Sequence, residues 1–184
     1  MEKQKTISGA ELALLSLLAE KPMHAYEIEQ VIEERGMREW TSIGFSSIYY
    51  LLNKMHTSGW LKREQLQSEA GGPNKQVFYL SDAGKNIWRE SVIDVLSLPH
   101  PGENPFLIGL SILPLLEKKE IQDGFQMHLI QLQKTAESLR KKLASYGKHI
   151  PRHVVAMFDY SQKQINASIT WIEEWLPVLS EKTR

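Results

Sequence analysis

The sequence contains no cysteine, which excludes disulfide bonds, thiol nucleophiles and cysteine-ligated zinc. It has no apolar run long enough to span a membrane, and its first residues, MEKQKTISGA, include no apolar signal region. These absences predict a cytoplasmic protein without a membrane partner. The net charge is zero as well, because 22 Lys and Arg residues balance 22 Asp and Glu residues. A zero balance argues against a nonspecific coat on nucleic acid, but it allows a local basic patch.

Patterns of catalytic and metal-binding residues are also missing. No carboxylate pair, nucleophile with its base, or phosphate-binding loop occurs at an informative spacing. His149 and His153 have the spacing of metal ligands on a helix, but Pro151 between them disfavours a regular helix. No glutamate completes an HExxH pattern there. We therefore predict no enzyme, no cofactor and no metal site.

The chain has 184 residues, of which 42 % are apolar, enough for one large domain or two small ones. The segment PHPGENP, residues 99–105, carries three prolines and has the composition of a linker. We predict a first domain over residues 1–98, a linker over 99–105 and a second domain over 106–184.

The first domain begins with three helices. Ser8 and Glu11 have the spacing of a capping box, and leucines follow at helical spacing. A second helix is predicted over 24–35, and a third over 45–58, before a glycine. LKREQLQ and KQVFYL then indicate two strands around the glycine-rich turn SEAGGPN, and Ser81 caps a fourth helix. Three helices followed by a hairpin are the order of a winged helix-turn-helix domain.

The third helix has two chemically different faces. Its core side is predicted to hold Ile48, Leu51, Leu52 and Met55. The opposite side carries hydroxyls, phenols, an amide and an ammonium, which suit phosphates and base edges. Alternatively, the tyrosines of this side only cover the core and its lysine is solvated. In a winged helix the third helix enters the major groove, and we predict groove contacts from Ser46, Ser47, Tyr49, Tyr50, Asn53 and Lys54.

The hairpin, or wing, is expected to contact the DNA backbone beside the groove. From Phe45 to Val77 four lysines and arginines stand against two glutamates, so the segment is weakly basic. Glycine at the turn lets the backbone approach a phosphate closely, and cations neutralise the phosphate. We predict backbone contacts from Lys62, Arg63, Gly72, Asn74 and Lys75.

The segments HAYEI, SSIYYLLNKM, GWLKR, GGPNKQVFYL and LSDAGK, in this order and spacing, resemble the PadR-type transcriptional regulators. The resemblance covers residues 8–90. The second half is similar to the larger subgroup, whose helical C-terminal region, with an ending like WIEEW (171–175), builds the dimer. It implies a mainly α fold with a small two-stranded wing and a C-terminal all-α dimerisation domain. It also implies a repressor that a small, aromatic or phenolic ligand releases from DNA.

Matches to the family and departures from it, in the third helix and the wing, bear on DNA contact. Tyr49 falls on the family's tyrosine at the start of the recognition helix, where it helps to position the DNA backbone. Tyr50 stands where many members carry proline, and Asn74 in the wing stands where a basic residue is common. These departures bear on the DNA sequence preference and not on the fold.

The second half of the chain is predicted to be all helical, with a kink or a break at Pro114. From Phe125 to Tyr146 apolar residues recur at alternating steps of four and three, which is a heptad seam for lengthwise packing. A hairpin with the last helix of the same chain would bury one such seam, and a homodimer would cover the apolar residues that remain. The dimer would also place two recognition helices roughly 34–36 Å apart, or a multiple of that, which predicts an inverted-repeat operator. The alternative is a monomer whose apolar residues fill its own core. We predict dimer contacts from Leu129, Leu132, Leu139, Ile165, Ile172 and Trp175.

Tryptophans indicate a small-molecule effector only weakly. Aromatic walls suit a flat ligand, and candidate walls are Trp40, Trp88 and Trp171, with Arg152 as a partner for a carboxylate. Alternatively, the tryptophans belong to the core and Arg152 to a solvated loop. A different class of function is also open. Winged helices dock on proteins, and the zero net charge suits a protein-interaction module without specific DNA binding.

Overall fold

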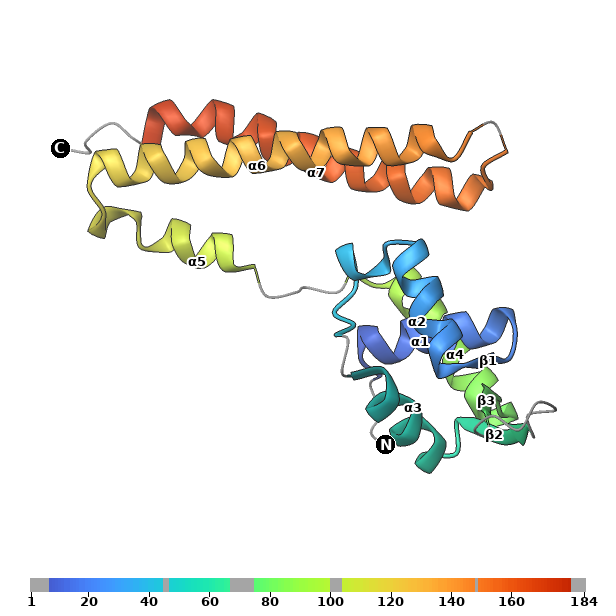
Figure 1. The fold of residues 1–184 in the computed structure, drawn as a ribbon. Coiled ribbons are helices and arrows are strands. Elements are labelled where there is room, and N and C mark those ends of the chain that lie inside the picture. Colours follow the sequence, from blue (N-terminus) through green and yellow to red (C-terminus); the bar gives the residue numbers. More distant parts are fainter. Residues whose placement is uncertain (1–6, 45–46, 67–74, 100–103, 148, 180–184) are drawn as a thin grey trace. The chain divides into compact units, whose positions relative to one another are not determined.

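A computed structural model describes residues 7–44, 47–66, 75–99, 104–147 and 149–179 (Figure 1). The chain forms two compact units, Met1–Pro101 and Gly102–Arg184. Most of the predicted linker, residues 100–103, lies outside the described residues. The fold is mainly helical with one small antiparallel sheet, and the predicted winged-helix class is confirmed.

The first unit contains every predicted helix and strand and one strand more. Its elements are α1 (Gly9–Glu20), β1 (Met23–His24), α2 (Ala25–Glu34), the 3₁₀ helix η1 (Met37–Glu39), α3 (Ser47–Thr57), β2 (Leu61–Leu66), β3 (Lys75–Leu80) and α4 (Asp82–Ser97). β1 pairs antiparallel with β3, so the sheet has three strands in the order β1-β3-β2. The sequence predicted only two strands because β1 is too short to show alternation.

The core of the first unit surrounds α1. Leu14 and Leu15 are fully buried, and Leu17 is 1 % exposed, because α1 is apolar around most of its circumference. The predicted capping box is confirmed at its start: Ser8 N donates to Glu11 Oε2 at 2.8 Å, and Glu11 N donates to Ser8 Oγ at 3.2 Å. From α2, α3 and the sheet, buried side chains complete this core, among them Met23, Ile28, Ile32, Ile48, Leu52, Met55 and Phe78.

The start of α4 is fixed to the segment between α3 and β2. Ser81 Oγ accepts from Gly84 N at 3.0 Å, which confirms the predicted N-cap. The same hydroxyl donates to the carbonyl of Gly59 at 2.6 Å, and Ser81 N donates to the carbonyl of Trp60 at 3.0 Å. Farther along α4, Trp88 Nε1 donates to Ser16 Oγ at 3.1 Å. These bonds attach α4 to both the end of α3 and the side of α1.

The second unit is a helical hairpin with a short helical segment beside it. It contains α5 (Pro105–Ser111), the 3₁₀ helix η2 (Leu113–Leu115), α6 (Lys118–Ser145) and α7 (Arg152–Leu179). Figure 1 shows α6 and α7 running side by side along their length. The predicted break at Pro114 is confirmed, since α5 ends at Ser111 and Pro114 lies in η2. Among the described helices none is long and apolar enough to cross a membrane.

The heptad seam of α6 packs against α7 within the same chain. Ile121, Phe125 and Ile172 are buried between the helices, and Leu129 and Leu132 are half-buried against them. Gly147 ends α6 with a φ of 73°, a left-handed conformation that glycine adopts without strain. The seam therefore holds the hairpin together, and a dimer needs further apolar surface.

Candidate nucleic-acid interface

The two predicted faces of α3 are confirmed. Ile48, Leu51, Leu52 and Met55 are buried, and Leu52 and Met55 are fully so. On the other side Tyr49 is 59 % and Tyr50 67 % exposed, and Asn53 is exposed as well. Two phenols and an amide therefore project from a helix that is anchored along its whole apolar side. Of the other predicted groove residues, Ser47 begins α3, while Ser46 lies outside the described residues.

Lys54, the remaining predicted groove residue, forms an ion pair with α1. Its Nζ lies 2.9 Å from Glu11 Oε1, and the Glu11 side chain is only 3 % exposed. Burial opposes ionisation of Glu11, but the backbone N–H of Ser8 and the Lys54 ammonium outweigh it and lower the pKa of Glu11. In return, the hydrogen bond and charge of Glu11 raise the pKa of Lys54. Both groups are charged at neutral pH, so the pair ties α3 to α1.

The segment that leads into α3 is held by Arg38. Its Nη1 donates to the carbonyl of Ile43 at 3.0 Å, and its guanidinium also pairs with Glu29 and Glu33 of α2, each at 3.4 Å. Ile43 itself is buried in the core. This network fixes the entry to α3 and thereby the side of the helix that faces outward.

In the wing, strand alternation separates two residues that the sequence grouped together. Lys62 pairs with Tyr79 and Arg63 pairs with Phe78, so the two cations lie on opposite faces of the sheet. Both are exposed, and neither forms an ion pair with any residue that the structure describes. The face of Lys62 also carries Glu64, whose Oε1 accepts from Tyr79 Oη at 2.7 Å. That bond, together with burial, raises the pKa of Tyr79.

The tip of the wing lies outside the described residues, and with it Gly72 and Asn74. Lys75 begins β3, where its backbone pairs with Leu66. The described surface therefore contains Tyr49, Tyr50 and Asn53 from α3 and the exposed cations of β2. Sequence reasoning missed the two residues that hold α3 in place, Glu11 and Arg38. Their partners lie on other elements, and the capping-box pattern assigned Glu11 only a local role.

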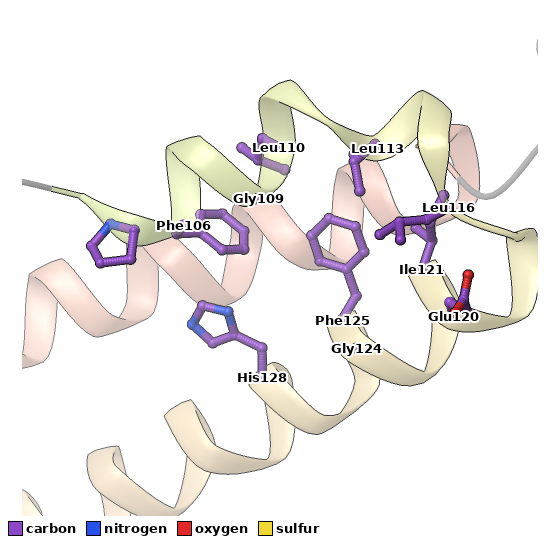
Figure 2. A pocket seen from close by; sticks show the side chains of 11 residues that line it. Phe106, Gly109, Leu110, Leu113, Leu116, Glu120, Ile121, Gly124, Phe125 and His128 are labelled. Carbon is purple, nitrogen blue, oxygen red and sulfur yellow. The ribbon is translucent and has the colours of Figure 1, made fainter.

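The second unit contains a hollow of about 270 Å³ between α5, η2 and the start of α6. Figure 2 shows Phe106 from α5 facing Phe125 and His128 from α6. The ring of Phe106 stands edge-on to His128 at 4.8 Å and to Phe125 at 5.9 Å between centroids. The remaining lining is mostly aliphatic, with Glu120 at one end: Pro105, Gly109, Leu110, Leu113, Leu116, Ile121 and Gly124.

The predicted effector residues are not gathered at one place within either unit. Trp171 lies beside the hollow, with its ring 5.6 Å from Phe106 and stacked on Trp175. Arg152 begins the same helix nineteen residues earlier, about 28 Å away at the rise of an α-helix. In the first unit Trp88 packs against the core, and Trp40 follows η1 and is 55 % exposed.

Of the predicted dimer residues, most are engaged in the hairpin. Ile172 is buried, and Leu129, Leu132, Leu139 and Ile165 are half-buried, whereas Trp175 is 43 % exposed. Other apolar side chains of the second unit remain exposed: Leu107, Ile108, Ile112, Leu115, Leu116, Val155, Met157, Tyr160 and Val178. No group of three metal-ligating side chains occurs among the residues that the structure describes.

Residues 14–90 match the model of the transcriptional regulator PadR-like family. The match lies within the first unit and includes α3 and the wing. No curated protein matches the chain significantly.

Several solved structures share the fold of nearly the whole chain. Bacillus subtilis PadR in complex with operator DNA gives a TM-score of 0.73 at 18 % identity, over 92 % of this chain and 98 % of that one. The same protein in complex with p-coumaric acid gives 0.74 at 18 % identity, over 93 % and 98 %. A PadR-like transcriptional regulator from Bacillus cereus gives 0.64 at 19 % identity, over 96 % and 99 %. At these identities the likeness concerns the fold, and it extends through both units.

Proposed function

Because residues 14–90 form a PadR-type winged-helix domain, we propose that this chain is a DNA-binding transcriptional regulator, a homodimeric cytoplasmic repressor released by a small ligand. The observation that carries the proposal is the outward face of α3. Tyr49, Tyr50 and Asn53 project from a helix whose other face is fully packed. Such a rigid, polar helix face is what the major groove accepts.

Each side chain of this face has a chemical role toward DNA. An asparagine amide pairs with the edge of adenine through one donor and one acceptor, so Asn53 reads a base. The phenol hydroxyls of Tyr49 and Tyr50 donate to phosphate oxygens and fix the register of the helix on the duplex. From β2, Lys62 and Arg63 neutralise phosphates beside the groove, as does Lys75 of the wing. Gly72 lets the backbone approach a phosphate closely, and the Asn74 amide donates to a phosphate oxygen.

Homodimerisation follows from the apolar surface that the hairpin leaves uncovered. In the segment from α5 to η2, Ile108 is 66 % and Leu115 83 % exposed, and on α7 Trp175 and Val178 are 43 % and 57 % exposed. Exposed apolar patches of this kind mark interfaces between proteins. A two-fold dimer covers the same patch on both copies and presents α3 twice, which suits an inverted-repeat operator.

The hollow beside Phe106 is the candidate effector site. Its volume of about 270 Å³ lies just below the usual range of ligand pockets, about 300–1,000 Å³, so only a small molecule with a single ring suits it. The aromatic edges of Phe106 and Phe125 contact such a ring, and His128 hydrogen-bonds its phenol or carboxylate. Bacillus subtilis PadR is known in complex with p-coumaric acid, a small aromatic acid. A ligand that binds one arrangement of α5 and α6 better than another shifts the dimer between DNA-binding and released forms.

Selection from a random DNA library tests the proposal. The purified protein is incubated with the library, bound DNA is recovered and sequenced, and the cycle is repeated. We expect enrichment of an inverted repeat with half-site centres about 10 base pairs apart, or a multiple of that. An Asn53→Ala variant is expected to enrich a motif that is degenerate at one position of each half-site. A pool that stays random after several cycles would contradict specific DNA recognition and favour a protein-interaction module.

A further inference from the structure

We propose that Glu11 withholds Lys54 from DNA, so that α3 reads the groove with neutral groups and the phosphate charge is met by the wing. Glu11 is then a positioning residue of the DNA-binding surface. The inference rests on the proposed function, and it revises the expectation that Lys54 itself contacts DNA.

The first argument is the burial of the carboxylate. The Glu11 side chain is 3 % exposed, whereas that of Lys54 is 50 % exposed. Glu11 Oε2 is occupied by Ser8, which donates from its backbone N–H at 2.8 Å and its hydroxyl at 2.9 Å. Glu11 Oε1 faces the Lys54 ammonium at 2.9 Å, and no other cation among the described residues pairs with it.

The second argument is the cost of exchanging partners. A phosphate that captured Lys54 would leave a buried carboxylate without a counter-ion, and an unpaired buried charge is strongly destabilising. A surface cation such as Lys62 can bind a phosphate without leaving a buried carboxylate unpaired, because it is exposed and forms no ion pair with any described residue. Phosphates are therefore neutralised at Lys62 before they are neutralised at Lys54.

The consequence concerns how strongly the protein holds DNA of any sequence. Each cation that neutralises a phosphate adds about 0.9 to the slope of log Kobs against log salt concentration. When Lys54 stays paired with Glu11, one cation fewer per subunit neutralises a phosphate, and the salt slope is correspondingly shallower. The reading of bases by Asn53 is unaffected, so the ion pair weakens binding to DNA of every sequence by about the same factor and leaves the ratio of specific to nonspecific binding unchanged.

Three variants of the full-length protein test the inference: Glu11→Gln, Lys54→Met and the double variant. The amide introduced by Glu11→Gln keeps the acceptor of the capping box, which accommodates Gln in place of Glu, but it no longer holds an ammonium. We expect Glu11→Gln to steepen the salt slope on random DNA by about 0.9 per subunit. Adding Lys54→Met to Glu11→Gln is expected to return the slope to the wild-type value. Lys62→Met is the matched control and is expected to flatten the slope by about 0.9 per subunit in either background.

The inference is overturned if Lys54→Met alone flattens the slope as much as Lys62→Met does, with Glu11→Gln leaving it unchanged. Thermal unfolding of the same variants gives a readout without DNA. Lys54→Met is expected to lower Tm because it leaves the buried carboxylate of Glu11 without a counter-ion, and the double variant is expected to recover most of that loss. A double variant no more stable than Lys54→Met would contradict the pairing. Wild-type protein that binds no DNA would overturn the proposed function, while the unfolding cycle would still decide whether Glu11 holds Lys54.

Discussion

Gly84 lies directly against the backbone of Trp60, and this contact joins the start of α4 to the entrance of the wing. A Cβ at Gly84 would overlap the carbonyl oxygen of Trp60 and come within 2.9 Å of its carbonyl carbon. The same carbonyl accepts the backbone N–H of Ser81. Since backbone moves less readily than a side chain, any residue larger than glycine must displace α4 from β2.

Replacement of Gly84 by alanine is therefore expected to destabilise the first unit by about 3 kcal/mol, at the upper end of overpacking effects. Gly9→Ala is the control, because a Cβ at Gly9 meets nothing within 4 Å, and its effect is expected to stay within about 0.5 kcal/mol. Urea unfolding followed by circular dichroism measures both. Equal stability of the two variants would show that α4 moves freely.

The ion pair between Glu11 and Lys54 predicts a dependence of stability on pH. The pKa of Glu11 lies below its ordinary value of 4.5 in the folded protein, where the bonds from Ser8 and Lys54 outweigh burial. A depressed pKa contributes stability that is present above pH 4.5 and is lost as the pH falls through the folded-state value. The stability gap between wild type and Glu11→Gln should therefore shrink as the pH falls below about 5. A gap that stays constant from neutral to acid pH would contradict this effect.

The amide of Asn53 is expected to read one base in each half-site. Asn53→Ala should reduce discrimination at that base by about 1–3 kcal/mol while leaving the salt slope unchanged. Asn86→Ala is the control, since Asn86 is an exposed asparagine on α4. Competition binding with single-base operator variants measures the discrimination. If Asn53→Ala leaves the discrimination between bases unchanged at every operator position, Asn53 does not read a base.

The seam of α6 is expected to tolerate no charge. Leu132→Asp places a carboxylate against α7 and should destabilise the second unit by at least about 2 kcal/mol, taking the dimer with it. Gln133→Asp introduces the same charge on the exposed neighbouring position and is expected to leave the dimer intact. Light scattering reports the mass, and a fully dimeric Leu132→Asp variant would contradict this role of the seam.

The hollow in the second unit predicts a spectroscopic response to small aromatic acids. Because Trp171 contacts Phe106 at 5.6 Å, p-coumaric acid bound there should change the tryptophan fluorescence. Phe106→Ala and His128→Ala are expected to weaken the response at least tenfold, whereas His149→Ala, at an exposed position before α7, should not. An equal response in all the variants would place the ligand elsewhere.

Local patterns in the sequence were sufficient to predict most of the fold. The capping box of Ser8 and Glu11, the N-cap at Ser81 and the break at Pro114 each depend on residues a few positions apart. The strand β1 was missed because its two residues carry no pattern and gain their partners only from β3. Bonds between distant segments, such as that from Trp88 to Ser16, left no periodic trace either.

The candidate site was predictable in part. Helical periodicity was enough to place Tyr49 and Asn53 opposite the core, whereas the pairing of Lys54 with Glu11 depends on how α1 and α3 pack. Strand alternation alone places the adjacent residues Lys62 and Arg63 on opposite faces of the sheet. Because they are neighbours in the sequence, they were nevertheless predicted together as contacts to the DNA backbone. The hollow could not be predicted, because it is lined by α5, η2 and α6 together.

A binding titration tests the central claim most directly. The purified protein is titrated against the DNA upstream of its own gene, with random DNA as competitor, at two salt concentrations. We expect a dimer that binds this DNA in preference to random DNA and loses affinity steeply as salt rises. Binding that is equal for both DNAs, or absent at low salt, would contradict the account and direct attention to protein partners of the winged-helix surface.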